Sequence, residues 1–428
     1  MKKALQWLFF TWFSLILLDS PIRYFLHNLD AIVLFYVKDI LLLIIILYGI
    51  VKAIKSMRIN KSTFVISGVI LVSIFMGLIN QLNFLQVLFG IKVFLPLLAG
   101  IVIGKYEILK PKHFIILYRI SIPVIIIGLI LEYFKLSPWT GFSYTFAGFT
   151  IEGNRYWTTF GIQRLSGFQR ASFESGILLV FLDMFYLLGV TVVKIEEKIN
   201  LRYYKLYDVL LFILSIIGII YTTSKTAYLA IFSLIAIYIL VIINLKSKDR
   251  IIQKLSLITI KSIISILFAF AIIPPIISFI NSNYMNKINL SNYSYLIKWF
   301  FTSFIDRMEN TWRDAFALVT HSYFKLLGRG MGGIGAPQQY FETYLYNPGD
   351  NIFVYLYVIF GYLVLGLIIW LIKQIAKIKI RGSNDISIIF FLLAFFSYGA
   401  TLSALESPIF SISIGVLISS YYNKQNKK

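Results

Sequence analysis

The chain has 428 residues, of which 59% are hydrophobic and 14% are charged, with a mean hydropathy of +0.81. A typical soluble domain is about 45–50% apolar and about 25% charged, so this composition excludes an ordinary soluble enzyme, a disordered chain and a disulfide scaffold. There is no cysteine, and His27, His113 and His321 are the three histidines, which argues against thiolate and multi-histidine metal sites. We therefore predict an integral membrane protein.

The formal net charge of +21 also fits a membrane protein. Lys and Arg beside apolar spans mark cytoplasmic loops and contact anionic lipid headgroups. A nucleic-acid-binding protein would gather these charges on a polar domain, and the sequence has no such domain. The charge predicts contact with membrane lipids and no binding of nucleic acid.

About twelve apolar segments approach the roughly 20 residues that a membrane span needs. In chain order they lie near 4–18, 31–51, 63–80, 84–104, 114–134, 176–195, 206–222, 226–245, 257–280, 352–372, 386–404 and 407–422. We therefore predict an all-α, polytopic integral membrane protein with about 12 transmembrane helices, forming one membrane domain over residues 1–428. Pro274 and Pro275 are predicted to break the ninth span, because proline removes a helical hydrogen bond and clashes with the preceding turn.

The basic residues alternate between connections. Every second connection is rich in Lys and Arg, beginning with Lys2 and Lys3 and ending with the tail at Lys427 and Lys428. The positive-inside rule then places both termini in the cytoplasm. It also places two long connections, 135–175 and 281–349, on the outside.

These two external loops are longer than the roughly 12–15 residues beyond which a loop is usually functional or disordered. They are rich in Trp, Phe and Tyr, which argues against disorder. Segments 296–305 and 310–327 have apolar residues at helical spacing, so we predict short interfacial helices there.

Arginine is frequent in the external loops, against the topological bias. The first loop contains Arg155, Arg164 and Arg170, and the second contains Arg307, Arg313 and Arg329. Guanidinium groups match phosphate oxygens with a rigid fork of donors. Pairing with loop acids or lipid headgroups would explain any one of them, whereas the set of six favours a site for an anionic substrate.

Two further features have more than one interpretation. The glycine-rich run 328–335 could turn backbone N–H groups toward an anion, or could simply form a tight loop. Lys38, Asp39 and Lys92 lie within predicted spans, where charges should face the protein interior and pair. They either form a structural ion pair or line the path of a lipid-linked substrate.

Four short motifs resemble those of the O-antigen polymerase and ligase superfamily. In order they are Arg164-Leu-Ser-Gly167-Phe168 with Gly176 at the next span; Thr223-Ser224-Lys225-Thr226-Ala227; Arg307 with Trp312-Arg313-Asp314-Ala315 and Leu327-Gly328-Arg329-Gly330; and Asp350-Asn351 before Gly361-Tyr362-Leu363-Val364-Leu365-Gly366. Lys225 stands where the superfamily usually has Arg. Asp350-Asn351 stands where ligases of lipopolysaccharide core usually have His-Asn, which favours a polymerase.

The resemblance implies a GT-C-like membrane glycosyltransferase that uses no metal or nucleotide cofactor. Its substrate would be a polyprenyl-diphosphate-linked oligosaccharide, polymerised into O-antigen, capsular polysaccharide or exopolysaccharide on the external face of the bacterial cytoplasmic membrane. A chain-length regulator and a flippase are the expected protein partners. The alternatives are a ligase that moves finished glycan to another acceptor, and a flippase or transporter for an anionic glycolipid.

Candidate site residues follow from this reaction. The cations chosen for the substrate diphosphate are Arg164, Lys225 and Arg307, supported by Arg170, Arg313 and Arg329. The candidate general bases, in order, are Asp350, Glu174 and His321. Two structural alternatives stay open: Glu174 pairs with Arg170, and Asp350 caps the helix that begins at Ile352.

Overall fold

The computed structural model describes residues 2–55, 61–146, 148–159, 161–197, 206–280, 294–320, 322–380 and 382–425, and these are mostly helical. The first elements are α1 (Lys2–Leu17), α2 (Asp19–Asn28), the 3-10 turn η1 (Ile32–Tyr36), α3 (Val37–Lys55), α4 (Lys61–Ile79), α5 (Phe84–Lys105), α6 (Pro111–Tyr133), α7 (Ser172–Glu197), α8 (Leu206–Thr222), α9 (Lys225–Lys246) and α10 (Arg250–Ile280). They are followed by α12 (Tyr295–Asp306), the π turn η3 (Arg307–Thr311), α13 (Trp312–Thr320), α14 (Ala336–Phe341), η4 (Thr343–Leu345), α15 (Ile352–Phe360), η5 (Gly361–Leu363), α16 (Val364–Ala376), α17 (Ser383–Gly399), η6 (Ala404–Glu406) and α18 (Pro408–Gln425).

The helices support an all-α membrane protein. Within the described ranges, seven helical segments are long and apolar enough to cross a membrane, or eight if the bent pair α1–α2 is one span. Four shorter apolar helices accompany them, at Gly68–Ile79, Leu206–Thr222, Asp385–Gly399 and Pro408–Ser419. The predicted apolar segments largely coincide with helices, although 352–372 spans α15, η5 and α16, and 386–404 extends beyond the end of α17 at Gly399.

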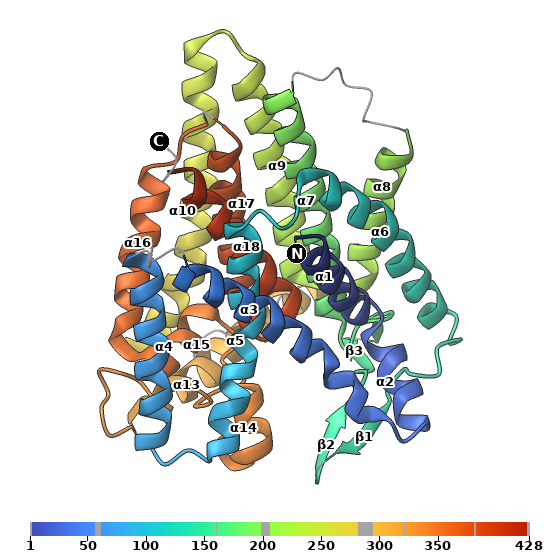
Figure 1. Ribbon diagram of the computed structural model, residues 1–428, viewed down its shortest axis with the longest axis vertical. Coiled ribbons are helices and arrows are strands. Elements are labelled where there is room, and N and C mark those ends of the chain that lie inside the picture. The colour runs from blue at the N-terminus through green and yellow to red at the C-terminus, as the bar shows by residue number, and fades with distance from the viewer. Residues whose placement is uncertain are drawn as a thin grey trace.

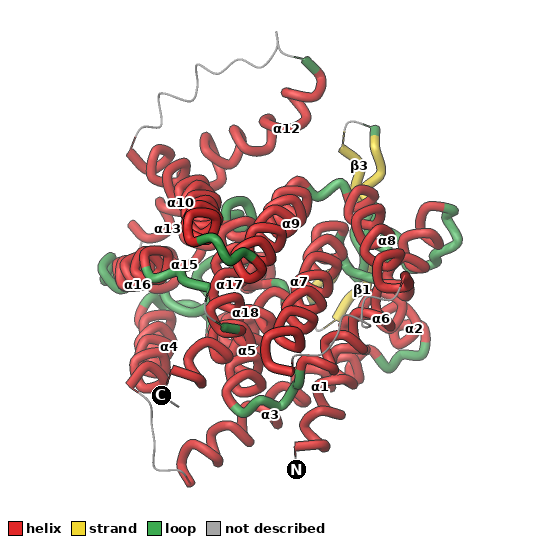
Figure 2. The backbone as a smooth tube through the Cα atoms, turned by 90° about the horizontal axis from the view of Figure 1, so that it is seen from above, coloured by secondary structure: helices red, strands yellow, loops and turns green. Residues whose placement is uncertain are grey.

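Helices α4, α7, α9, α10 and α16 run roughly along the vertical of Figure 1, whereas α3 crosses obliquely, and α2, α13, α14 and the short strands gather at the lower end. Seen from above, α7, α17 and α18 lie near the centre, while α4, α8, α12 and α16 lie at the periphery (Figure 2). The central position of α7 agrees with its burial, since 83% of its apolar window is buried inside the protein.

Helices α5 and α18 approach each other through glycines. A Cβ atom at Gly100 would collide with the carbonyl of Ile412, and one at Gly415 would collide with the carbonyl of Leu97. Apolar lipid tails provide no hydrophobic drive for two spans to associate, so small residues that permit close backbone contact stabilise such pairs by packing. The α5–α18 pair is therefore a close-packed unit of the bundle.

The first long loop contains β-structure that the sequence analysis did not predict. Strand β1 (Ser143–Phe146) pairs antiparallel with β2 (Phe149–Glu152), and β3 (Trp157–Thr159) pairs antiparallel with β4 (Ile162–Arg164). In the second loop, α12 covers the first predicted helix, whereas α13 ends at Thr320 instead of continuing to 327.

The prediction that Pro274 and Pro275 break the ninth span is wrong. Helix α10 continues through both prolines to Ile280. Proline at 275 cannot donate to the carbonyl four residues earlier, at Ala271. The Asn351 side chain donates to that carbonyl instead, at 2.9 Å, so the Ala271 carbonyl keeps a partner within the continuous helix.

Asn351 joins three helices through one side chain. Its Oδ1 accepts from the backbone N–H groups of Phe353 and Val354, at 2.9 and 3.1 Å, and so caps α15. Its Nδ2 donates to Ala271 in α10 and to the carbonyl of Ala400 at the end of α17, both at 2.9 Å. Asn351 is fully buried, so every one of these bonds is shielded from water.

Replacing Asn351 by Ala should destabilise the protein. A buried polar group left without a partner costs about 1–3 kcal/mol. The substitution removes the Asn351 partner of two carbonyls and two N–H groups. We expect a lower melting temperature in detergent solution. Asn310→Ala is the matched control, because Asn310 is exposed and donates only to Asp306 among its recorded bonds. Equal melting temperatures for Asn351→Ala and the wild type would contradict this role.

Candidate functional site

A cavity of about 1720 Å³ is lined by both long loops and by the ends of several helices. Its charged lining includes Arg155, Arg164, Arg170, Glu174, Lys225, Arg307, Asp350 and Glu406. Apolar side chains from α3, α5, α9 and α10 also line it, among them Leu42, Leu88, Val93, Leu229, Ile266 and Phe270. The cavity can therefore receive a molecule with both an anionic and an apolar part.

The loop motif at 164–168 is held against α6 by a buried carboxylate. Glu132 Oε2 accepts from the backbone N–H of Ser166 at 2.7 Å, from the Ser166 hydroxyl at 3.0 Å and from the N–H of Gly167. Gly167 has φ +61°, and a Cβ there would lie 3.0 Å from the backbone nitrogen of Leu129. Glycine at 167 is thus required by backbone conformation and by close packing.

The same loop meets the end of α8. The N–H of Leu165 donates to the carbonyl of Tyr221 at 3.3 Å, which brings Arg164 toward the turn that carries Lys225. Gly176 permits the neighbouring contact, because a Cβ there would lie 2.9 Å from the Ala227 side chain at the start of α9. Two motifs that are distant in sequence therefore meet at the cavity.

Arg164 carries an unused donor. Its guanidinium lies over the Trp157 ring, 5.1 Å from the ring centroid. Its Nε is buried and has no hydrogen-bond partner among the described residues. Burial, followed by the nearby charge of Arg307, lowers the pKa of Arg164 from its usual value. A bound anion would satisfy the donor and relieve this repulsion.

Lys225 and Arg307 join Arg164 in what we call the cationic cluster. Lys225 Nζ donates to the carbonyl of Trp299 and lies 4.6 Å from the centroid of the Trp299 ring. Arg307 Nη1 donates to the carbonyl of Ser303 at 3.1 Å. The three charges are close enough to repel one another, which favours binding of an anion at this place.

Asp350 is the acid partner of the cluster. Its Oδ2 accepts from Arg307 Nε at 3.0 Å, and its carbonyl accepts from the indole N–H of Trp312 at 3.3 Å. Its backbone has φ +39°, a conformation uncommon for a residue with a side chain. The interpretation of Asp350 as a helix cap is wrong, because the following residue, Asn351, provides the cap.

Glu174 and Arg170 line the cavity without forming a salt bridge in the described structure. Arg170 Nε donates to the carbonyl of Glu152 at 3.0 Å. Arg170 is nevertheless close enough to act electrostatically on the Glu174 carboxylate. The structural alternative in which Glu174 pairs directly with Arg170 is therefore wrong, and the two charges interact at longer range.

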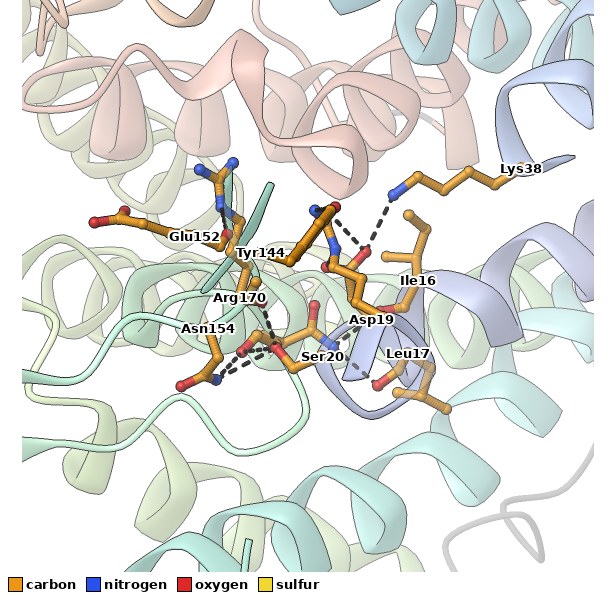
Figure 3. A network of polar contacts seen from close by, with 12 residues as sticks. Ile16, Leu17, Asp19, Ser20, Lys38, Tyr144, Glu152, Asn154 and Arg170 are labelled. Atoms are coloured by element: carbon orange, nitrogen blue, oxygen red, sulfur yellow. Dashed lines mark hydrogen bonds and ion pairs between the residues drawn. The ribbon is translucent and has the colours of Figure 1, made fainter. Parts of the chain in front are cut away.

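A polar network between α2 and the first loop positions Arg170 (Figure 3). Ser20 Oγ donates to the carbonyls of Gly153 and Gln169, at 3.0 and 2.9 Å. Asn154 Nδ2 donates to the Gln169 carbonyl at 2.9 Å. Because Gln169 precedes Arg170, these bonds hold the backbone from which Arg170 enters the cavity.

Pairs of charges within the membrane helices also line the cavity. Lys92 Nζ lies 2.9 Å from Asp39 Oδ2, and Lys38 Nζ lies 3.1 Å from Asp19 Oδ1. Lys38, Asp39 and Lys92 all face the cavity. The two interpretations given to these residues are therefore compatible, since they form ion pairs and also contribute to the cavity wall.

Arg313 and Arg329 are not brought to this cavity. The Arg313 side chain is 53% exposed and lies 3.9 Å from the equally exposed Asp314, a kind of pair that contributes little to stability. Arg329 is 6% exposed and donates to Glu342 Oε1 at 2.7 Å and to the Gly333 carbonyl at 3.0 Å. His321 lies outside the described residues.

The glycine-rich run 328–335 is a packing loop. The N–H groups of Arg329 and Met331 donate to the carbonyls of Val358 and Ser73, at 2.7 and 3.0 Å. Cβ atoms at Gly330 and Gly332 would collide with the backbones of α4 and α5. Of the two interpretations given to this run, the structure supports the tight loop.

Glu406 was missed by the sequence analysis. It lies in η6, between α17 and α18, and its Oε1 accepts from the N–H of Ala336 at 2.7 Å. Burial raises the pKa of Glu406 to about 7. A signal was present in the sequence, because Glu406 is the one charged residue between Asp385 and Lys424.

The described part of the chain contains no candidate metal site built from His, Cys, Asp and Glu side chains. Within those ranges, no three His, Cys, Asp or Glu side chains are grouped so that they could hold a metal ion. The cavity instead offers arginine, lysine and carboxylate groups, whose chemistry is charge stabilisation and proton transfer.

Comparison with known families finds a matching domain over the middle of the chain. Residues 210–371 match a family model described as O-Antigen ligase, so the chain carries a domain of that family and the predicted resemblance to the O-antigen polymerase and ligase superfamily is confirmed. The matched range contains Lys225, Arg307 and Asp350, whereas Arg164 and Glu406 lie outside it. Comparison with curated proteins and with solved structures gave no match. The family implies an enzyme that transfers glycosyl groups.

Replacing Glu132 by Ala should loosen the first loop. Two backbone N–H groups lose their acceptor, at about 1–3 kcal/mol each, so transient opening should increase by about tenfold or more. The measurement is the rate of protease cleavage within residues 135–171 of the detergent-solubilised protein. Glu107→Ala, at an exposed position outside the cavity, is the control. An unchanged rate for Glu132→Ala would show that the carboxylate does not hold the loop.

Proposed function

We propose that this protein is a membrane glycosyltransferase that polymerises polyprenyl-diphosphate-linked oligosaccharide repeat units. The product is O-antigen, capsular polysaccharide or exopolysaccharide, assembled on the external face of the bacterial cytoplasmic membrane. The observation that carries the proposal is the cationic cluster of Arg164, Lys225 and Arg307 in a cavity that also has an apolar lining and carboxylates. A lipid diphosphate combines the anionic and apolar parts that this cavity can receive.

The proposed reaction joins two lipid-linked glycans. A hydroxyl oxygen of the acceptor sugar forms a bond with the anomeric carbon of the donor glycan, and the bond from that carbon to the diphosphate oxygen breaks. The electron pair of the broken bond leaves with the lipid diphosphate, and the hydroxyl proton passes to a base. Donors placed in advance around the leaving group stabilise the charge that develops there, which is the role given to the cationic cluster.

The finer features of the sequence prediction belong to this proposal. They are a GT-C-like arrangement of about 12 spans, both termini in the cytoplasm, and an active site that faces outside. The proposed partners are membrane lipids, a flippase that supplies repeat units and a chain-length regulator. Asp350 and Glu174 are the sequence-derived candidate bases that line the cavity, and no metal or nucleotide cofactor is required.

A ligase is the second candidate, favoured by the description of the matching family. It would perform the same bond exchange but would transfer finished glycan to a different acceptor. The residues Asp350-Asn351 favour the polymerase, because ligases of lipopolysaccharide core usually have His-Asn at this place.

Arg164→Ala should abolish polymer formation while the protein stays in the membrane. The variant removes a donor whose loss costs about 2.7–4 kcal/mol in comparable sites. The measurement is glycan length on a gel, in cells that lack the protein and are complemented with the wild type, Arg164→Ala or the exposed control Arg313→Ala. A ladder that collapses to single lipid-linked repeats, restored by the wild type and the control, is the expected result.

Other patterns on the same gel would identify another function. Long polymer that stays on its lipid without reaching a final acceptor indicates a ligase. Repeats trapped on the cytoplasmic side indicate a flippase. Normal chain lengths with Arg164→Ala would remove Arg164 from the site.

Lys225 should be replaceable by Arg but not by Met. Arginine keeps the positive charge and is the usual residue of the superfamily at this place, whereas Met should slow transfer by about 10²–10³-fold. The initial rate of polymer formation by purified protein is the measurement, with Lys248→Met, at an exposed position outside the cavity, as the control. Wild-type rates for Lys225→Met would exclude a role in charge stabilisation.

A further inference from the structure

Among the carboxylates of the cavity, Glu406 is oriented by the protein without being paired to a cation within salt-bridge distance. Its Oε1 accepts from the N–H of Ala336 at 2.7 Å, and its Oε2 lies 3.5 Å from the Ser403 hydroxyl. The Tyr355 side chain on α15 also interacts with it. These contacts come from α14, from α15 and from the turn that carries Glu406 itself, so the carboxylate is held in one direction while it lines the cavity.

The other four carboxylates that line the cavity, Asp39, Glu174, Asp306 and Asp350, are less suited to accept a proton. Asp350 and Asp39 are engaged in ion pairs with Arg307 and Lys92, at 3.0 and 2.9 Å. Asp306 is exposed and accepts from the side chain of Asn310 at 2.9 Å. Glu174 has no recorded side-chain hydrogen bond in the described structure, so nothing fixes its direction. A general base must be oriented toward the proton that it removes.

We propose that Glu406 is the general base that accepts the proton of the acceptor hydroxyl, and that Asp350 acts instead by positioning Arg307. This inference rests on the proposed function. In the transfer step, the hydroxyl oxygen bonds to the anomeric carbon, the hydroxyl proton moves to the Glu406 carboxylate, and the lipid diphosphate leaves with the electron pair of the broken bond. The protonated Glu406 then returns its proton to water.

The charges around Glu406 agree with this role. Arg170 and Asp350 both act on it, with opposite sign, and Tyr346 and Tyr355 face it from the second loop and from α15. Burial is the largest influence and raises the pKa of Glu406 to about 7. A base with a pKa near the working pH combines a useful ionised fraction with enough proton affinity.

Glu406→Gln is a sharp test, because the amide oxygen of Gln can still accept from Ala336 while the proton-accepting carboxylate is lost. With purified protein and a polyprenyl-diphosphate-linked repeat unit, we expect kcat to fall by about 10²–10⁴-fold with little change in KM. Binding of polyprenyl diphosphate alone should be unchanged, which also shows that the variant is folded. Glu107→Gln, at an exposed position outside the cavity, is the matched control.

The pH profile provides a second readout that a purely structural role would not change. Glu406 must be ionised to act, so the wild-type rate should fall by about tenfold per pH unit below about pH 7. This fall in rate at low pH, the acidic limb of the profile, should be absent from the residual activity of Glu406→Gln. Glu406→Asp, which keeps a carboxylate on a shorter side chain, should keep the limb at a reduced rate, and it carries the test if Glu406→Gln does not fold.

The outcomes separate the two proposals. Wild-type kcat and a wild-type pH profile for Glu406→Gln, in a protein that polymerises repeat units, would overturn the role of Glu406 alone. A wild-type protein that forms no polymer at any pH would overturn the polymerase and, with it, this inference.

Discussion

The arrangement of the site depends on the hydrogen bonds of one buried amide, Asn351. Its side chain donates to the α10 carbonyl that Pro275 leaves without a donor, and to the carbonyl of Ala400 at the end of α17. It also caps α15 by accepting from a backbone N–H group there. A buried polar group with all its bonds made stabilises one specific packing, because any other packing would leave some of them unsatisfied. Asp350 precedes this amide in the chain, so the fixed Asn351 determines where the Asp350 carboxylate meets Arg307.

The helices were predictable because their signal is local. Apolar runs of span length identify helices with little reference to the rest of the chain, and the predicted runs largely coincide with helices. The failure at Pro274 and Pro275 has the opposite cause, since the donor that keeps α10 continuous comes from residue 351. The hairpins of the first loop were likewise missed. The first of them packs its side chains against α2 and η1, and a local sequence pattern does not contain such contacts.

The site was predictable to the extent that its residues lie in motifs. Arg164, Lys225, Arg307 and Asp350 were all selected from short patterns, and the fold brings them to one cavity. Arg329 belongs to a pattern too, yet it pairs with Glu342 and packs the glycine-rich loop, a distinction that sequence spacing alone does not contain. Glu406 has no motif around it, and its importance depends on the Ala336 N–H and the Tyr355 side chain, which only the folded chain places beside it.

Two sides of the cavity are held by different kinds of contact. On one side, α5 and α18 pack closely through glycine contacts. Helix α5 carries Lys92, and α18 begins two residues after Glu406. On another side, α12 is held through its own carbonyls by Lys225 and Arg307. Phosphate oxygens are stronger acceptors for these cations than a backbone carbonyl. A bound anion therefore competes with α12 for Lys225 and Arg307, whereas the packing of α5 against α18 involves neither cation.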